Sequence, residues 1–524
     1  MMPSIHASVG VPDPEESETM VEPVEHVVPL MSARLGKGFS RELKEHLVGR
    51  MLDESRKMFH AYFAVDRAHT VMLAERGIIT PDQARQILLE LERIEALGPD
   101  GFRTDPAFDS FLPQVERAMS ERIGEAVAGR MHTGRSRIDH DAAVLRLHSR
   151  DQLLRVFDYL LGLQRSVLRL AAQHVTTLMP GYTHLQHAQP WTFGHYLLRQ
   201  SYVYDRDADR LRGAYARTNL SSLGGAALAG TSWPLDRQRT CELLGHDAVV
   251  VNSHDAGCFS EDYRTENAAV LAILVNNVAR LAGDIYLWHT WEFQMVEVDG
   301  AYCGTSSIMP QKKNADACEC VRGLAGRALG WLPAALGMLK GASSTDCDSD
   351  FVPDVFGEAA DTTWRALDLM QGVLDTLVVK PDRMRERAGI YWSTASNLAD
   401  TIVREKGLSF RTAHHVVATL VRLATERNLR PDQVTSTLLA EAAREALGHT
   451  LDLPDSAIHR ALDPEEFMRN RQTLGSIHPD ETRRMLGDCQ DRVQAHQAWR
   501  DSAKARLAGA HEALQGAVSQ YTGI

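Results

Sequence analysis

The chain has 524 residues, of which 44% are hydrophobic and 24% charged, and its formal net charge is −12. This length exceeds one ordinary hydrophobic core, so we expect a soluble protein of about two to four domains. The negative charge argues against a nucleic-acid-binding protein, which needs clustered Lys and Arg, but it does not exclude anionic substrates, because the local field of a site matters more than the total charge.

The termini and the cysteines predict a cytoplasmic protein that does not contact a membrane. Residues 1 to about 30 are acidic and contain prolines, which indicates a disordered or loosely docked arm rather than a secretory signal. The seven cysteines include no CxxC pair, as expected of free thiols in a reduced chain. No apolar run approaches the roughly 18 residues that a membrane helix needs. The best candidate, residues 329–339, contains Pro333 and fits a buried helix better.

Helical periodicity dominates the rest of the chain. Thr80 and Pro81 have the form of a helix start, and this helix should run to Leu97, where Gly98 and Pro99 would end it. Strand-like alternation is scarce apart from residues 249–252. The pattern therefore predicts an all-α protein with long helices in its middle and smaller helical ends. The other expected helices cover residues 64–73, 153–172, 268–291, 395–405 and 412–426 and most of the last forty residues.

The first segment that could carry chemistry is residues 131–140, Met-His-Thr-Gly-Arg-Ser-Arg-Ile-Asp-His. A glycine followed by hydroxyl and guanidinium groups at a helix start suits the binding of a carboxylate, through backbone N–H groups and a bidentate arginine. A basic loop that pairs with acidic neighbours has the same pattern. This segment alone favours the basic loop.

The second segment is residues 179–190, Met-Pro-Gly-Tyr-Thr-His-Leu-Gln-His-Ala-Gln-Pro. His184 and His187 are three residues apart, which on a helix could suggest a metal pair. However, no carboxylate or third histidine stands at ligand spacing, so we predict no metal.

The third segment is residues 304–314, Gly-Thr-Ser-Ser-Ile-Met-Pro-Gln-Lys-Lys-Asn. A mobile loop of this composition can place a serine oxygen beside a substrate while lysine and asparagine hold an anion. As a bare pattern it could also be a basic surface loop. A glycine-bearing run at 223–231 has no Lys-Ser/Thr pair for a P-loop, and the acidic run at 346–350 lacks the glycine and glutamate of a calcium loop.

These three segments, in this order, resemble the signature segments of the fumarase/aspartase superfamily, especially its argininosuccinate lyase branch. The resemblance extends from about Asp66 to His414. It implies three helical domains, at residues 1–129, 130–378 and 379–524. The middle domain would contribute to a twenty-helix core in a homotetramer, and each active site would be composed of segments from different subunits.

The resemblance implies a cofactor-free carbon–nitrogen lyase that reversibly eliminates an amine from an N-substituted aspartate and releases fumarate. Argininosuccinate, giving arginine and fumarate in amino-acid metabolism, is the default substrate. Two alternatives stay open. The same chemistry could act on another N-succinyl-type amine or aminocarboxylic acid, or the chain could be a catalytically silent structural relative, like some lens crystallins.

Such an elimination needs a base for a weakly acidic proton at Cβ, a cation for the dianionic intermediate and a proton for the leaving nitrogen. By the resemblance, Ser306 is the base and Lys312 stabilises the intermediate. His184 serves or assists the acid, and Glu319 orients this histidine. The residues implied to bind the substrate are Ser136, Arg137, Thr183, Gln311 and Asn314.

The chain departs from the family pattern at several positions. Ile138 stands where the family has a substrate-binding asparagine, and His140 stands in place of a glutamine. In the third segment, Thr305 replaces a glycine and Ala315 replaces a proline. The family's downstream Tyr-Asn-x-Asp-x-Gln-Glu-Asp-Lys stretch is not recognisable. The identity of the amine partner therefore stays open.

Overall fold

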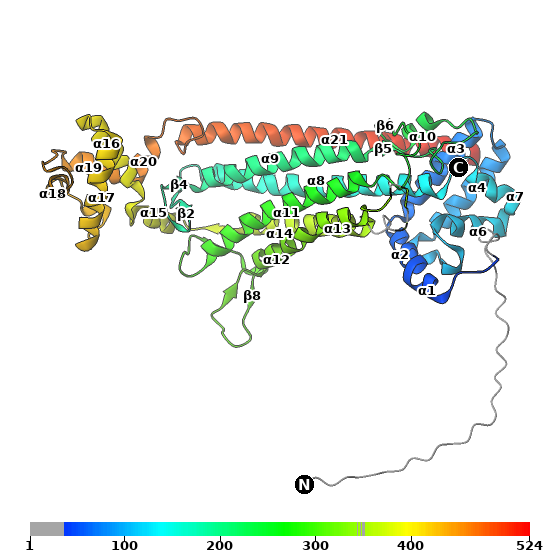
Figure 1. Cartoon of the computed structure of the whole chain (residues 1–524), viewed down its shortest axis with the longest axis horizontal. Coiled ribbons are helices and arrows are strands. Elements are labelled where there is room, and N and C mark those ends of the chain that lie inside the picture. Colours follow the sequence, from blue (N-terminus) through cyan, green and yellow to red (C-terminus); the bar gives the residue numbers. More distant parts are fainter. Residues whose placement is uncertain (1–35, 343, 346, 348–351, 524) are drawn as a thin grey trace, which may run out of the picture.

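The computed structural model describes residues 36–342, 344, 345, 347 and 352–523. The acidic arm of residues 1 to about 30 and most of the acidic run at 346–350 lie outside these residues. Long helices run side by side along the long axis of the molecule, and a smaller helical body lies at each end (Figure 1). The prediction of an all-α fold is confirmed.

The N-terminal body contains the helix start predicted at Thr80. The Thr80 side chain accepts a hydrogen bond from the backbone of Gln83, whose side chain accepts from the backbone of Thr80, which completes a capping box. The helix ends at Glu95, two residues before the expected Leu97. The elements of this body are α1 (Arg41–Leu43), η2 (Lys44–Val48), α2 (Gly49–Lys57), α3 (Phe59–Glu75), α4 (Pro81–Glu95), α5 (Gly98–Gly101), η3 (Pro106–Phe108), α6 (Phe111–Ile123), α7 (Glu125–Ala128) and η4 (Gly129–His132).

The central bundle contains the long helices predicted for the middle of the chain. The helix expected at 153–172 is the second half of α8, and the helix expected to reach Trp291 ends at His289. These helices pack against one another around a shared apolar core. They are α8 (Arg137–Gln173), α9 (Phe193–Thr218), α11 (Asp262–His289), α12 (Asp316–Arg327), η6 (Ala328–Gly330), α13 (Trp331–Met338) and α14 (Val352–Thr376), with α10 (Arg237–Leu243) and η5 (Gly300–Tyr302) in the connections.

Two helices of the bundle correct the sequence-based expectations. Helix α11 is long and apolar enough to cross a membrane, whereas no such run was expected. It packs against α9, α12, α13 and α14, so its apolar composition fits a core helix that is covered on several sides. The segment expected as a buried helix, 329–339, is only partly covered in the chain: Trp331 and Ala335 are buried, whereas Leu329 is 83% and Leu336 54% exposed.

The described strands are all two residues long, and each pair of strands joins two connecting segments beside the bundle. The strand expected at 249–252 is present only at Val249. Strand β5 pairs in parallel with β6, and the other pairs are antiparallel. The pairs are β1 (Leu178–Met179) with β4 (Trp191–Thr192), β2 (Tyr182–Thr183) with β3 (Gln186–His187), β5 (Leu220–Ser221) with β6 (Ala248–Val249), β7 (Val296–Glu297) with β10 (Val378–Val379), and β8 (Gly304–Thr305) with β9 (Lys313–Asn314).

The C-terminal body has its own apolar core, and the last helix leaves it. Helix α21 returns along the bundle, where Met485 joins the bundle core, and reaches the N-terminal body, where Leu514 joins that core. The expected long terminal helix is confirmed, and the domain boundaries stay a prediction. The elements are α15 (Pro381–Gly389), η8 (Trp392–Thr394), α16 (Ala395–Lys406), α17 (Phe410–Glu426), η9 (Pro431–Gln433), α18 (Ser436–Leu447), α19 (Asp455–Leu462), α20 (Pro464–Arg469) and α21 (Pro479–Thr522).

Candidate active site

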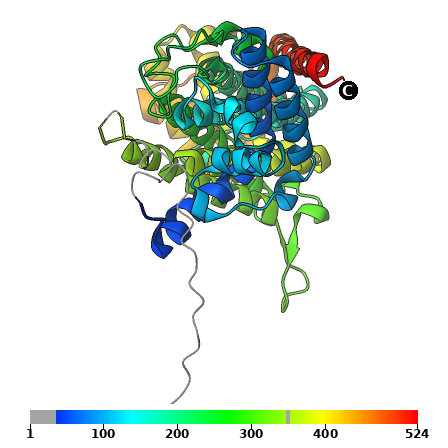
Figure 2. The same ribbon diagram turned by 90° about the vertical axis from the view of Figure 1, so that its right-hand side faces the viewer.

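The three chemistry-bearing segments lie in three separate places on one chain. Ser136 precedes α8 beside the N-terminal body, and the hairpin β2–β3 lies at the opposite end of the bundle (Figure 1). The hairpin β8–β9 projects away from the bundle in both views (Figures 1 and 2), and its base lies beside His289, the last residue of α11. On one chain the three segments therefore lie apart (Figure 1).

The first segment begins α8 through a second capping box. The backbone N–H of Ile138 donates to Ser136 Oγ at 3.3 Å, and that of Ser136 donates to Asp139 Oδ1 at 2.8 Å. The other carboxylate oxygen of Asp139 accepts from the backbone nitrogens of Gly224 and Ala226, at 2.8 and 3.0 Å. Burial raises the pKa of Asp139, although these donors oppose the shift. The glycine-bearing run at 223–231 therefore binds a carboxylate of the chain itself.

The basic-loop interpretation of the first segment holds for Arg135. The buried Arg135 guanidinium lies 2.7 Å from Asp66 Oδ1 on α3. Ser136 and Arg137 are half-buried at the start of α8, and the Ser136 side chain caps backbone N–H groups of the first turn.

The second segment forms a tight hairpin rather than a helix. His184 and Leu185 occupy its turn with φ values of 54° and 59°, which side chains other than glycine and asparagine rarely adopt. Thr183 and His184 are exposed. A cavity of about 510 Å³ beside the turn is lined by His184, Trp191, His195, Arg199, Arg280 and Asp284. A strained turn that presents a histidine beside polar groups suits a reacting side chain better than a structural one.

The third segment is the hairpin β8–β9, whose tip carries Ser306. Gly304 pairs with Asn314, and Ile308 at the tip is 81% exposed. The Ser306 Oγ accepts hydrogen bonds from the backbone N–H groups of Ile308, at 3.3 Å, and Met309, at 3.0 Å. Gly304 lies so close to Asp316 that a Cβ there would be 1.9 Å from Asp316 Oδ2, so only glycine fits this strand without rearrangement.

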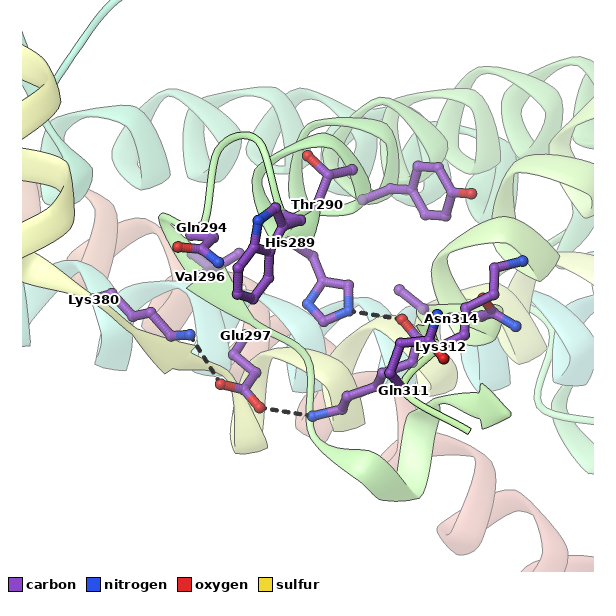
Figure 3. Close-up of a pocket in the computed structure, with 13 residues that line it drawn as sticks. His289, Thr290, Gln294, Val296, Glu297, Gln311, Lys312, Asn314 and Lys380 are labelled. Atoms are coloured by element: carbon purple, nitrogen blue, oxygen red, sulfur yellow. Dashed lines mark hydrogen bonds and ion pairs between the residues drawn. The ribbon is translucent and has the colours of Figure 1, made fainter. Parts of the chain in front are cut away.

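A cavity of about 560 Å³ lies at the base of this hairpin (Figure 3). Gln311, Lys312 and Asn314 line it, together with His289 and Glu297. The structure thus brings three of the candidate residues to one cavity. Within the described part of the chain, the Lys312 ammonium has no ion-pair partner, so it is available to an anion.

Lys313 has a structural role instead. Its ammonium lies 2.9 Å from Glu297 Oε1, while Lys380 lies 3.0 Å from Glu297 Oε2 (Figure 3). The hydrogen bonds from these two lysines lower the pKa of Glu297 to about 2. His289 Nε2 donates to the Lys313 carbonyl at 3.4 Å, and its Nδ1 accepts from the Val298 backbone at 3.2 Å. His289 and Glu297 therefore anchor strand β9.

Glu319 lies exposed on α12, beside Tyr286 of α11. Burial raises the pKa of Tyr286, and the charge of Glu319 adds to this shift. Among the described residues no hydrogen bond or ion pair joins Glu319 to His184 of the same chain, so the orienting role of Glu319 stays a prediction.

Sequence reasoning missed three residues that organise the site. The spacing of Ser136 and Asp139 is a recognisable capping-box pattern, so a search for helix starts could have found Asp139. His289 and Glu297 act through contacts with Lys313 over 24 and 16 positions, and no local pattern signals such pairs.

The chain matches two protein families and several known proteins over most of its length. Residues 44–330 match the family described as lyase, and residues 392–469 match the argininosuccinate lyase C-terminal family. The argininosuccinate lyase of Methanocaldococcus jannaschii is 36% identical over 469 residues, which are 89% of this chain and 95% of that protein. The argininosuccinate lyase of Methanosarcina acetivorans is 36% identical over 473 residues, 90% and 94% of the two chains.

Solved structures also align with most of this chain. The crystal structure of EDDS lyase in complex with formate has a TM-score of 0.83 and 35% identity, and the alignment covers 92% of this chain and 96% of that one. A fumarate lyase from Mesorhizobium sp. BNC1, at 21% identity and a TM-score of 0.64, shares the fold; the alignment covers 84% of this chain and 97% of that one.

Proposed function

Because this chain belongs to the lyase family that includes the argininosuccinate lyases, we propose that it reversibly eliminates an amine from an N-substituted aspartate and releases fumarate. The observation that carries this proposal is the β8–β9 hairpin. Its serine oxygen faces two backbone N–H groups, and its Lys312 and Asn314 line a cavity at the same hairpin. These are the groups that proton abstraction beside a carboxylate requires.

In the proposed reaction, Ser306 removes a proton from Cβ of the aspartyl unit, and the N–H groups of Ile308 and Met309 stabilise its alkoxide form. The electron pair moves into the adjacent carboxylate, whose added charge Lys312 neutralises. The bond between Cα and nitrogen then breaks, and His184 donates a proton to the departing amine. The residues proposed to hold the substrate are Ser136, Arg137, Thr183, Gln311 and Asn314.

We further propose that the chain assembles as a homotetramer whose sites combine segments from different copies. The separation of the three segments on one chain supports this arrangement (Figure 1). So does an open face along α12–α13. Added Cβ atoms at Gly323, Gly326 and Gly330 would meet nothing within 4 Å, and Leu329 is exposed on η6 between the two helices. Small residues beside exposed leucines allow helices of another copy to approach closely.

Argininosuccinate is the first substrate to test, because the curated relatives named above are argininosuccinate lyases. A second candidate is another N-succinyl-type amine. Two observations favour it: EDDS lyase is as similar to this chain, at 35% identity, as the argininosuccinate lyases are at 36%, and Ile138 replaces the asparagine expected by resemblance. A silent, crystallin-like role is disfavoured because Ser306, His184 and Lys312 are all present. A cytoplasmic location stays a prediction.

The test is to follow ultraviolet absorbance for fumarate release from argininosuccinate, and then for fumarate consumption with a panel of arginine, diamines and amino acids. Release from argininosuccinate supports the first substrate. Consumption of fumarate only with another amine supports the second candidate. Inertness with every amine would overturn the proposed lyase activity, provided that a Ser306→Ala sample fixes the background.

A further inference from the structure

We propose that His140, in addition to the groups that react, is a positioning residue that works as a buried imidazolium and holds the Ser136–Arg137 turn in its substrate-binding pose. The role in substrate binding rests on the proposed function. The protonation of the ring rests on the contacts of His140 alone.

Both ring nitrogens of His140 face carboxylates. The side chain is fully buried; its Nε2 lies 3.0 Å from Asp66 Oδ1 of α3, and its Nδ1 lies 3.3 Å from Asp141 Oδ1 of α8. An ionised carboxylate can only accept hydrogen bonds, so each nitrogen must carry a proton to bond with its neighbour. A neutral ring would direct one lone pair at a carboxylate oxygen.

The charges around the ring favour a protonated His140. Asp66 and Asp141 supply two negative charges, and Arg135, 2.7 Å from Asp66, supplies one positive charge. The buried Asp139 also interacts with Arg135, so a neutral His140 would leave several carboxylates facing a single guanidinium, which is costly. The other titratable groups that face the ring from α3 are Tyr62 and His69.

The pKa shifts agree with this balance. Burial lowers the pKa of His140, but the charge of Asp66 and the hydrogen bond with Asp141 outweigh it, so the pKa is raised above its usual value. Burial likewise opposes ionisation of Asp66, yet Arg135 and His140 lower its pKa to about 2. Burial and Arg135 lower the pKa of His69, which therefore stays neutral.

This cluster lies directly beneath the substrate-binding turn. The backbone N–H of His140 donates to the Ser136 carbonyl at 3.2 Å, and Arg135 is the residue before Ser136. His69 Nε2 donates to the Thr133 carbonyl at 3.0 Å, so α3 holds the segment on the other side of the turn. Loss of the His140 proton would weaken the contacts of the ring with Asp66 and Asp141, and with them the position of the turn. Substrate binding should suffer more than the chemical step, because Ser306 and His184 lie on other segments.

By the resemblance a glutamine is expected where this chain has His140, so His140→Gln is the test variant. For the native enzyme we expect KM to rise about tenfold per pH unit above the pKa of His140, while kcat follows the same pH profile in the native enzyme and in His140→Gln. In His140→Gln this rise should be absent between about pH 7 and 9, below the titration of lysine. His449→Gln, at an exposed position of the C-terminal body, is the control and should keep the native profile. An unchanged rise of KM in His140→Gln would overturn the proposal.

A second measurement does not need turnover. Because the folded-state pKa of His140 lies above its unfolded value, its stabilising contribution is present at low pH and is lost as pH rises through the folded pKa. The Tm of the native protein should therefore fall toward that of His140→Gln as pH rises. A difference in Tm that stays constant with pH would overturn the proposal that the His140 ring is protonated. If the protein is inert toward all amines but the difference in Tm between the native protein and His140→Gln narrows as pH rises, the proposed function is contradicted and the protonation of His140 is not. If His140→Gln does not fold, Asp66→Asn takes its place. In Asp66→Asn the rise of KM, or the fall in Tm, should occur at lower pH than in the native protein. The same pH profile in both proteins would overturn the proposal.

Discussion

The hydroxyl oxygen of Ser306 lies 3.0 Å from the backbone nitrogen of Met309, which donates a hydrogen bond to it. The backbone nitrogen of Ile308 is a second donor at 3.3 Å. A serine hydroxyl is a weak base unless its alkoxide is stabilised, and two N–H dipoles aimed at the oxygen provide this stabilisation. Because both donors belong to the same turn, the hairpin can stabilise the alkoxide form of Ser306 before a substrate binds.

Replacing Ser306 by alanine should remove this prepared oxygen while leaving the fold unchanged, since Ser306 is half-buried at an exposed hairpin tip. We expect kcat to fall by about three orders of magnitude or more, with the assembly intact by size-exclusion chromatography. Ser307→Ala, the exposed neighbour, is the matched control and should retain most of the activity. Near-native turnover of Ser306→Ala would assign the base to another group.

The two adjacent lysines of the hairpin should behave differently. Lys312 lines the cavity without an ion-pair partner in the described residues, whereas Lys313 is paired with Glu297. Lys312→Met should therefore weaken fumarate binding and lower kcat by about 10²-fold or more, because the charge that develops in the substrate loses its cation. Lys313→Met should act more weakly, through the anchoring of β9. Fumarate affinity by calorimetry and kcat distinguish them; the reverse order would assign the anion to Lys313.

Asp139 should be important for stability as well as for the site. Its buried carboxylate accepts backbone hydrogen bonds from Ser136, Gly224 and Ala226, and an asparagine would present an N–H₂ group to some of these donors. We expect Asp139→Asn to cost about 1–3 kcal/mol and to lower Tm measurably. Asp209→Asn, at an exposed position of α9, is the control. Equal Tm values for the two variants would show that the carboxylate does not hold the glycine-bearing run.

The long helices and their caps could be predicted because periodicity and capping are local. Thr80 and the start of α4 are the best example. The turn at His184 and Leu185 could not be predicted, since neither residue has the left-handed preference of glycine or asparagine. The strands of two residues are too short for alternation to appear. The exposure of Leu329 was also missed, because an apolar helix pattern does not reveal whether the same chain or another copy covers it.

The most direct test of the composite lyase site mixes two inactive variants. His184→Asn, which tolerates the left-handed backbone of this turn, and Ser306→Ala should each be nearly inactive alone. After unfolding and refolding at one to one, half of the histidine positions and half of the serine positions are intact. If different copies supply them, about a quarter of the native activity should return. Mixed assemblies that form but stay inactive would contradict a site that takes His184 and Ser306 from different copies.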